Sequence, residues 1–365
     1  MDITKIDKNL IATPIKATDV IWRNAQEKIF STHGVFYSVE EGHYRRMPKE
    51  IAENISNGVK VLSTCSTGGR IRFITDSPYV AVKAVLQDMP LSSNSSLGAQ
   101  SGFSVYADAV FQGNLRPEFA NVRNAKDGKY VFASMVKTGN LGLRNIEIYM
   151  PLYNCVYEVY IGLQEGCRLE QSSPYNFQNP IVFYGSSITQ GGCASHPGND
   201  YASIVCRKLN ADYINLGFSG SAKGEPLMAE YLSSVKAQAL VLDYDCNAPD
   251  VAWLQETHYP MYERIRQAQP NVPIVFMTRP NFLFDPKAFI PRREVIYNNY
   301  LKAKAQGDGR VEFIDGETLL GKEDWDMCTV DRTHPNDFGF YRMAEKVYPV
   351  LKKVLSKTEI ETDKV

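Results

Sequence analysis

The stretch IVFYGSSITQGG (181–192) decides how the C-terminal half of this chain folds. Its first five residues are nearly all apolar, which is typical of a strand covered on both faces by helices. The small and polar residues that follow end the strand and lead into a predicted helix. Ser187 therefore lies on a strand-to-helix turn, with its hydroxyl exposed and the first N–H groups of the helix nearby. A nucleophile can stand there, but so can an ordinary turn or N-cap serine.

Four more apolar runs of the same kind follow, at residues 213–218, 239–244, 273–278 and 311–315. Helical patterns alternate with them: Ala202, Val205, Cys206 and Leu209 share one face, as do Met343, Val347, Val350, Leu351, Val354 and Leu355. Buried strands that alternate with helices predict a doubly wound α/β domain, in which helices cover both faces of a parallel five-stranded sheet.

Residues 59–165 show a different pattern, in which apolar and polar residues alternate over short runs. The predicted strands are 70–74, 79–86, 103–111, 130–136, 145–149 and 156–161. Short strands with this period of two predict an antiparallel β-sandwich. The polar stretch QSSPYNFQNP (171–180) contains two prolines and predicts a linker. We therefore expect an N-terminal β-sandwich domain at 1–172 and an α/β domain at 173–365.

Charge and hydropathy exclude several classes of function. The formal net charge is −1, so no overall positive field attracts nucleic acid or an anionic membrane. No apolar stretch has the length of a membrane span, and the N-terminal MDITKIDKNL has no apolar signal region. We expect a cytoplasmic protein, unless a signal peptide was removed from the sequence.

The seven cysteines are widely spaced and form no CxxC pair. A thiolate zinc site or a dithiol redox motif is therefore not expected. We expect reduced, mostly buried thiols, which favours a reducing compartment.

Candidate chemical groups follow the predicted strands, where open parallel sheets collect their functional residues. Gly220 follows the second strand, and a glycine there lets a backbone N–H approach a substrate closely. Asn247 follows the third strand, and its side chain can donate to a developing oxyanion. A structural role is an equal alternative for both: a plain turn for Gly220, and an Asx-turn or helix cap before Pro249 for Asn247.

The turn DRTHP (331–335) comes after the fifth strand and before the last helix. An Asp and a His three positions apart on one turn can face the same site. The carboxylate of Asp331 would then orient the imidazole of His334, and the imidazole would remove a serine proton. The alternative is a capping or core histidine. Since the chain has only five histidines, the position of this one in a D-x-x-H-P turn weighs against that alternative.

These four turns, in this order, resemble the conserved blocks of the SGNH/GDSL hydrolases. The family's G-D-S-[IL]-[TS] block corresponds to GSSIT (185–189), which implies that Ser187 is the nucleophile. The glycine of the second block falls on Gly220, the asparagine of the G-x-N-D block on Asn247, and the D-x-x-H block on Asp331 and His334. The resemblance covers about residues 180–355. SGFSVYAD (101–108) is loosely similar to a G-x-D-L-Y-V strand in the β domain that precedes some family members.

The chain departs from the family pattern at three positions. Ser186 replaces the usual Asp before the nucleophile, a change typical of a subgroup with the look of YGSSITQGG. Asp245 and Ala248 replace the Gly and Asp that flank the third block. The second departure puts in doubt how Asn247 is held, or adds a carboxylate to the rim of the pocket.

The resemblance implies a fold and a mechanism. The fold is a flavodoxin-like, doubly wound α/β sheet preceded by a jelly-roll-like β-sandwich. The mechanism is that of a serine esterase, in which His334 activates Ser187 and an acyl-enzyme forms. The oxyanion hole comprises the N–H groups of Ser187 and Gly220 and the side chain of Asn247. The resemblance implies no metal and no organic cofactor.

The expected substrates are short esters, above all O-acetyl groups on sugars or oligosaccharides. Asp245, His196 and Asp200 are candidate substrate-binding residues, although a loop and helix cap is the alternative for the last two. Neither nucleic acid nor membrane insertion is expected. The alternatives are a lipase or thioesterase acting on longer acyl chains, and a carbohydrate-binding protein whose hydrolase domain is inactive.

Overall fold

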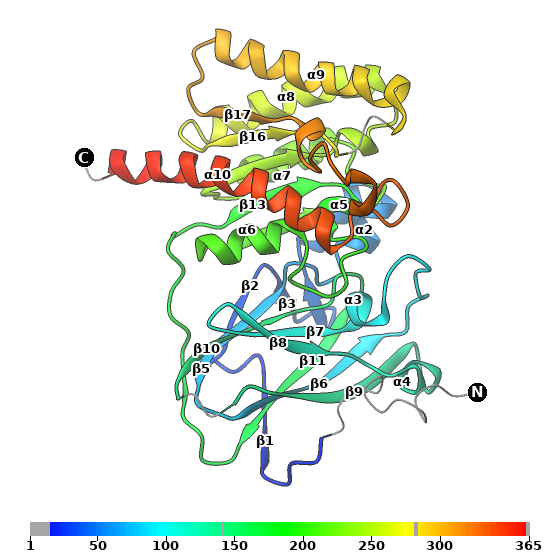
Figure 1. The fold of residues 1–365 in the computed structure, drawn as a ribbon, viewed down its shortest axis with the longest axis vertical. Helices are drawn as coiled ribbons and strands as arrows, with labels where there is room; N and C mark the ends of the chain where they lie inside the picture. Colours follow the sequence, from blue (N-terminus) through cyan, green and yellow to red (C-terminus); the bar gives the residue numbers. More distant parts are fainter. Residues whose placement is uncertain (1–14, 140–141, 281–283, 363–365) are drawn as a thin grey trace. The chain divides into compact units, whose positions relative to one another are not determined.

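The computed structural model describes residues 15–139, 142–280 and 284–362 (Figure 1). They form two compact units. The N-terminal unit holds the described residues up to Arg46, together with 64–174 and 195–198. The C-terminal unit holds 47–63, 175–194 and the described residues from Asn199 onward. Each unit therefore includes a short segment from the other side of the linker at 171–180.

The C-terminal unit is built on one parallel sheet of five strands. Its strands are β13 (Ile181–Gly185), β14 (Tyr213–Gly217), β15 (Ala239–Asp243), β16 (Ile274–Met277) and β17 (Val311–Ile314). Their order across the sheet is β14-β13-β15-β16-β17, and every neighbouring pair is parallel. This 2-1-3-4-5 order is that of flavodoxin-like folds, which confirms the predicted fold class.

Helices cover both faces of this sheet. They are α1 (Lys49–Ile55), α2 (Asn57–Leu62), α5 (Ser187–Gln190), α6 (Tyr201–Leu209), α7 (Pro226–Ser234), α8 (Val251–Ala268), α9 (Pro286–Ala305) and α10 (Asp337–Thr362). Tyr184 of β13 shares a buried cluster with residues of α7, α8 and α9. Phe183, whose side chain points to the other face, contacts Tyr201 of α6, and α6 packs against α10 (Figure 1). Because successive side chains of β13 point to opposite faces of the sheet, this one strand packs against helices on both faces.

The N-terminal unit contains two larger antiparallel sheets around one buried core, and a separate two-stranded antiparallel sheet of β3 and β4. The first has the order β1-β11-β6-β9, and the second the order β12-β5-β10-β7-β8, with β2 paired to β5. The bounds are β1 (Val20–Asn24), β2 (Ser31–His33), β3 (Phe36–Ser38), β4 (His43–Arg45), β5 (Arg70–Thr75), β6 (Tyr79–Gln87), β7 (Phe103–Ala107), β8 (Val110–Leu115), β9 (Lys129–Lys137), β10 (Arg144–Tyr149), β11 (Val156–Gln164) and β12 (Leu169–Glu170). Two short helices, α3 (Leu97–Ser101) and α4 (Phe119–Arg123), interrupt the strands.

One predicted strand was wrong. The run 103–111 is a hairpin of β7 and β8, not a single strand. Asp108 and Ala109 turn the chain with positive φ angles of 49° and 65°. Tight hairpin turns of this kind usually contain a glycine, and this turn has none. The alternation of apolar and polar residues continues through the turn, so the sequence pattern gave no sign that the chain reverses direction there.

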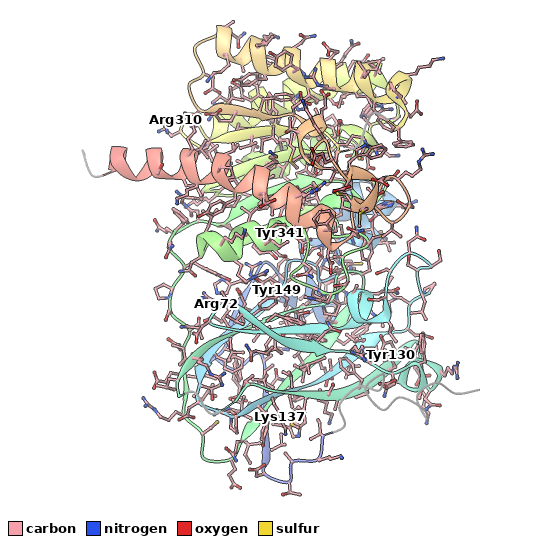
Figure 2. All side chains as sticks on the ribbon, in the orientation of Figure 1. Arg72, Tyr130, Lys137, Tyr149, Arg310 and Tyr341 are labelled. Atoms are coloured by element: carbon pink, nitrogen blue, oxygen red, sulfur yellow. The ribbon has the colours of Figure 1, made fainter. Side chains whose placement is uncertain are left out.

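The second of the larger sheets of the N-terminal unit carries a cluster of polar and charged side chains, two of which, Arg72 and Tyr149, are labelled in Figure 2. Arg70 is fully buried, and its Nε lies 3.7 Å from a carboxylate oxygen of Glu147. Arg72, directly across the ladder from Glu147, lies at the same distance. The hydroxyl of Tyr149 donates to the other carboxylate oxygen at 3.0 Å. Buried charges of this kind are tolerated because they are paired and hydrogen-bonded.

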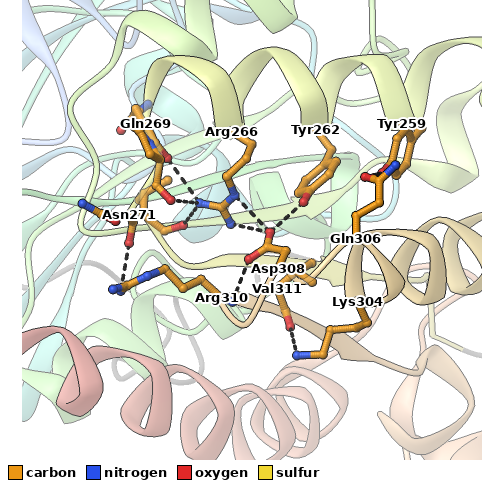
Figure 3. A network of polar contacts seen from close by, with 12 residues as sticks. Tyr259, Tyr262, Arg266, Gln269, Asn271, Lys304, Gln306, Asp308, Arg310 and Val311 are labelled. Carbon is orange, nitrogen blue, oxygen red and sulfur yellow. Dashed lines mark hydrogen bonds and ion pairs between the residues drawn. The ribbon is translucent and has the colours of Figure 1, made fainter.

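A polar network closes the amino-terminal edge of the sheet in the C-terminal unit (Figure 3). The carboxylate of Asp308 accepts hydrogen bonds from the hydroxyl of Tyr262 at 2.6 Å, from Nε of Arg266 at 3.0 Å and from the backbone N–H of Arg310 at 2.7 Å. Arg266 also donates to the carbonyl of Val272. Asp308, Tyr262, Arg266 and Arg310 line a cavity of about 640 Å³, at the opposite edge from the carboxyl ends of the strands.

No helix in the described ranges is long and apolar enough to cross a bilayer. The N-terminal residues that motivated the expectation about targeting lie outside those ranges.

The Asp308 network makes a prediction about stability. Burial would raise the pKa of Asp308, but the hydrogen bonds from Tyr262 and Arg310 and the charge of Arg266 hold it below its ordinary value. The carboxylate therefore stabilises the fold above the unfolded-state pKa of about 4, and the contribution is lost as the pH falls through the lower folded-state pKa. Asp308→Asn should lower the free energy of unfolding at pH 7 by roughly 1–3 kcal/mol.

Urea unfolding at a series of pH values measures this effect. The exposed neighbour Glu263→Gln serves as the control and should change stability by less than about 0.5 kcal/mol. The loss from Asp308→Asn should shrink below pH 4, and an equal loss at pH 7 and pH 3 would contradict the role of the charge.

Candidate active site

Two glycines place the nucleophile turn at the carboxyl edge of the sheet. Helix α5 begins at Ser187, directly after β13, and lies so close to the strands that added side chains would collide with it. A Cβ at Gly185 would overlap the side chain of Thr189, and a Cβ at Gly217 would overlap the backbone of Gln190. Ser186 caps the helix by accepting from the N–H of Ile188 at 3.2 Å. Ser187 is thereby presented, half-buried, at the first turn of α5.

Ser187, His334 and Asp331 form a continuous hydrogen-bonded relay. The Oγ of Ser187 lies 2.8 Å from Nε2 of His334. The Nδ1 of His334 lies 2.8 Å from a carboxylate oxygen of Asp331. Because an ionised carboxylate only accepts hydrogen bonds, Nδ1 carries the proton and Nε2 can accept the proton of the serine hydroxyl. This is the arrangement that nucleophilic catalysis by serine requires.

A closed turn fixes the carboxylate and the imidazole together. Thr329 and Pro335 form an antiparallel bridge, and the N–H of Val330 donates to the carbonyl of His334 at 2.9 Å. The second carboxylate oxygen of Asp331 accepts from the backbone N–H of His334 at 2.8 Å. Partial burial would raise the pKa of Asp331, but the backbone and side-chain hydrogen bonds of His334 hold it below its ordinary value. Asp331 is therefore ionised, and its negative charge lies beside the ring of His334, where it would stabilise an imidazolium.

The predicted oxyanion donors sit on turns that are tied to one another. The side chain of Asn247 donates to the carbonyl of Phe218 at 3.2 Å, two residues before Gly220. Gly220 is exposed, with a φ of 65°. The N–H of Ser219 donates to the side chain of Gln190, the last residue of α5. Hydrogen bonds thus connect all three turns, while the joint action of their donors on an oxyanion stays a prediction.

The three predicted substrate-binding residues have structural partners. Asp245 is 1 % exposed and accepts from the backbone N–H of Arg279. Burial raises the pKa of Asp245 to about 6. Asp200 is fully buried as the N-cap of α6, where it accepts from the N–H of Ser203. These contacts place neither carboxylate on a pocket rim, and for Asp200 they match the helix-cap alternative.

His196 falls in the N-terminal unit. Its ring stacks on Phe111 with 4.3 Å between centroids, and its Nδ1 lies 3.1 Å from the hydroxyl of Ser104. The short segment 195–198 thus joins the sheet that carries β7 and β8, although the chain on both sides of it belongs to the C-terminal unit.

Sequence reasoning missed a buried carboxyl group behind the nucleophile. Asp243 ends β15 and accepts hydrogen bonds from Thr189 at 2.8 Å and from Tyr201 at 3.3 Å. Complete burial, reinforced by the neighbouring Asp245, raises the pKa of Asp243 well above its ordinary value. The side chain therefore links α5, α6 and β15 through a polar contact in the core. Its position inside the apolar run 239–244 gave no signal of this role.

Sequence reasoning also missed a cysteine at the relay. Cys65, Cys155, Cys206 and Cys328 are buried, whereas Cys167, Cys193 and Cys246 are half-buried. One ligand atom each of Cys193, Asp331 and His334 lie within 4.8 Å of one another. Burial and the nearby charge of Asp331 raise the pKa of the Cys193 thiol to about 11. Cys193 is therefore a neutral thiol beside the catalytic candidates.

Two protein-family models match this chain. Residues 178–352 match the model of the GDSL-like lipase/acylhydrolase family, and residues 20–169 match the model of the N-terminus of Esterase_SGNH_hydro-type. The chain belongs to the SGNH/GDSL hydrolase family. It is a carboxylic ester hydrolase. No curated protein is similar enough to count as a relative.

Several solved structures match both units of this chain. A Bacteroides ovatus protein, described as a GDSL-like lipase, is 28 % identical with a TM-score of 0.80, over 92 % of this chain and 98 % of its own. A salicylyl-acyltransferase from a tetracycline biosynthetic pathway is 19 % identical, with a TM-score of 0.73 over 91 % and 96 %. A family two carbohydrate esterase from Clostridium thermocellum, solved with cellohexaose, is 15 % identical, with a TM-score of 0.62 over 90 % and 99 %. The last two similarities show the fold alone.

The relay predicts where a serine-directed reagent reacts. A fluorophosphonate should label Ser187 in this SGNH/GDSL chain, because His334 can take the proton of that hydroxyl. Peptide mapping identifies the labelled residue. Ser187→Ala should abolish labelling and His334→Ala should slow it strongly. The control Ser219→Ala removes a nearby hydroxyl that donates to Gln190, and it should leave the labelled site unchanged. A label outside 185–189 would contradict the assignment.

Proposed function

We propose that this esterase removes acetyl groups from O-acetylated sugars or oligosaccharides through an acyl-enzyme on Ser187. The observation that carries the proposal is the relay from Ser187 through His334 to Asp331, with both contacts at 2.8 Å. An inactive carbohydrate-binding protein would have no need of a complete relay, so the geometry favours catalysis over binding alone.

The relay supports a two-step reaction. In the first step His334 takes the proton of Ser187 while Oγ attacks the ester carbonyl, and the imidazolium then gives that proton to the departing alkoxide. In the second step His334 takes a proton from water while the water oxygen attacks the acyl-enzyme carbonyl. The imidazolium then returns that proton to Oγ of Ser187 as the acid leaves, which restores the free enzyme. The ionised Asp331 stabilises the imidazolium in both steps.

Three N–H donors would stabilise the oxyanion of each tetrahedral intermediate. They are the backbone N–H groups of Ser187 and Gly220 and the side-chain amide of Asn247. The amide has two N–H groups, and its hydrogen bond to the carbonyl of Phe218 uses only one. That hydrogen bond would also hold the amide in place, so that it needs no reorganisation when the charge develops.

The turns around the nucleophile support a short acyl group and a hydroxylated alcohol. Small and polar residues, among them Ser186, Gly191 and Gly192, follow β13. A closed pocket for a short acyl group, which this proposal requires, would admit added methylene groups only with steric clashes. The similarity in fold to a carbohydrate esterase solved with cellohexaose is consistent with a sugar as the alcohol.

One observation favours the alternative, a lipase or thioesterase acting on longer acyl chains. Met327 and Val330, which are 64 % and 52 % exposed, lie on the segment that leads into Asp331. Apolar side chains that solvent reaches beside a catalytic turn can contact an acyl chain. The acyl-chain preference therefore decides between the two functions.

The oxyanion hole makes a prediction about rates. Asn247→Ala should lower kcat on p-nitrophenyl acetate by about 10²–10³-fold, because one donor to the developing charge is lost. KM should change little, since the interaction is made mainly in the transition state. The matched control is Asn336→Ala, in which the lost amide donates to the carbonyl of Met327 beside the catalytic turn. A similar loss of kcat in both variants would point to general disruption of the site.

The substrate assignment predicts a steep dependence on acyl-chain length. The acetyl ester should have the highest kcat/KM in a series from acetyl to octanoyl p-nitrophenyl esters, and acetate should be released from acetylated xylo- or manno-oligosaccharides. A preference for octanoyl, or no acetate from any acetylated sugar, would support the lipase or thioesterase. Esters formed with added alcohols in place of free acid would instead indicate an acyltransferase.

A further inference from the structure

Cys193 brings a third kind of ligand atom to the catalytic turn. Its sulfur, a ring nitrogen of His334 and a carboxylate oxygen of Asp331 lie within 4.8 Å of one another. Cys193 and His334 are half-buried and Asp331 is exposed, so the cluster is open to solvent. The proposed ester hydrolysis uses the nitrogen and the oxygen but has no role for the sulfur.

The backbone holds Cys193 in this place. Gly191 caps the carboxyl end of helix α5 in the left-handed conformation, and the N–H of Gly192 donates back to the carbonyl of Ser187 at 2.8 Å. Ala194 is buried, and its N–H donates to the carbonyl of Gly191. Cys193 itself has a φ of 72°, which is uncommon for a residue with a side chain. The same turn that follows the nucleophile thus presents the sulfur to the relay.

We propose that Cys193, Asp331 and His334 form a binding site for Zn²⁺ that switches the esterase off. The inhibitory consequence rests on the proposed function, since it requires His334 to be the catalytic base. The binding of the metal does not, because it depends only on the three side chains.

The donor set selects the metal. One sulfur, one imidazole nitrogen and one carboxylate oxygen are ligands that Zn²⁺ accepts together, with bonds of roughly 2.0–2.3 Å and a fourth position left for water. Mg²⁺ and Ca²⁺ prefer sites made only of oxygen. Small adjustments of the three side chains would close separations of up to 4.8 Å to those of tetrahedral coordination.

Metal binding and catalysis compete for the same atoms. A zinc ion on Nε2 of His334 would displace the hydrogen bond with Ser187, and an ion on Nδ1 would replace the proton that links His334 to Asp331. In either case the imidazole could no longer take the serine proton. Coordination of the thiol releases its proton to the solvent, and no electron is transferred. Removing the metal would restore the relay.

Binding is measured first, on the full-length protein without substrate. Co²⁺ serves as a spectroscopic probe for the zinc site, because a cobalt–thiolate bond gives a charge-transfer absorption in the near ultraviolet. The wild type should show this band, and excess Zn²⁺ should remove it. Cys193→Ser should lack the band, whereas the control Cys167→Ser, which alters a half-buried cysteine of the N-terminal unit, should keep it. A band that survives Cys193→Ser would overturn the site.

Inhibition is measured second, at buffered free Zn²⁺ concentrations. Each variant's hydrolysis of p-nitrophenyl acetate is normalised to its own rate in EDTA. Zn²⁺ should inhibit the wild type reversibly, and Cys193→Ser should raise the half-inhibiting concentration by at least about tenfold, or 1.4 kcal/mol. Mg²⁺ should have no effect. Equal zinc sensitivity of the wild type and Cys193→Ser would overturn the inference even in an active esterase.

The two measurements separate the inference from the proposed function. A protein that binds cobalt through Cys193 but hydrolyses no ester would refute the function and keep the metal site. A protein that hydrolyses acetyl esters but shows no thiolate band would do the reverse.

Discussion

The close approach of helix α5 to strands β13 and β14 is the constraint on which the site depends. Gly185 and Gly217 make it possible, because a side chain at either position would overlap α5. The contact places Ser187 at the carboxyl edge of the sheet. Parallel strand order then brings the turns that follow β13, β14 and β15 to the same edge. The relay to His334 spans 147 residues of sequence, and it needs no strained connection because both partners leave the sheet at that edge.

The environments of the acidic residues divide their roles. Asp331 is partly exposed and accepts backbone and imidazole hydrogen bonds, so its pKa is low and the carboxylate is charged. Asp243 and Asp245 are buried, and burial raises the pKa of both. Both buried residues hold neighbouring segments by hydrogen bonds: Asp243 accepts from the hydroxyl of Thr189 in α5, and Asp245 accepts from the backbone N–H of Arg279. The three residues are all aspartates, so the difference in their pKa values comes from their exposure to solvent and their hydrogen bonds, and not from residue type.

Much of this architecture could be predicted from the sequence. Near-continuous apolar runs located all five parallel strands. The turns after those strands named Ser187, Asp331 and His334 as candidates, and the structure joins them in one relay. What failed depends on contacts that have no local signature. The hairpin at Asp108 lacks a turn glycine. The buried carboxylate of Asp245 accepts from the backbone of Arg279, which is 34 residues away. Cys193 meets His334 only because the chain folds back after α5.

The most direct test of the account is to trap the covalent intermediate. The protein is mixed with p-nitrophenyl acetate, quenched in acid within the first turnovers and analysed by mass spectrometry of its peptides. We predict one acetyl group per protein, on Ser187, together with a burst of p-nitrophenol that matches the enzyme concentration. An acetyl group on another residue, or steady hydrolysis with no burst and no acetylated peptide, would contradict the role of Ser187 as the nucleophile.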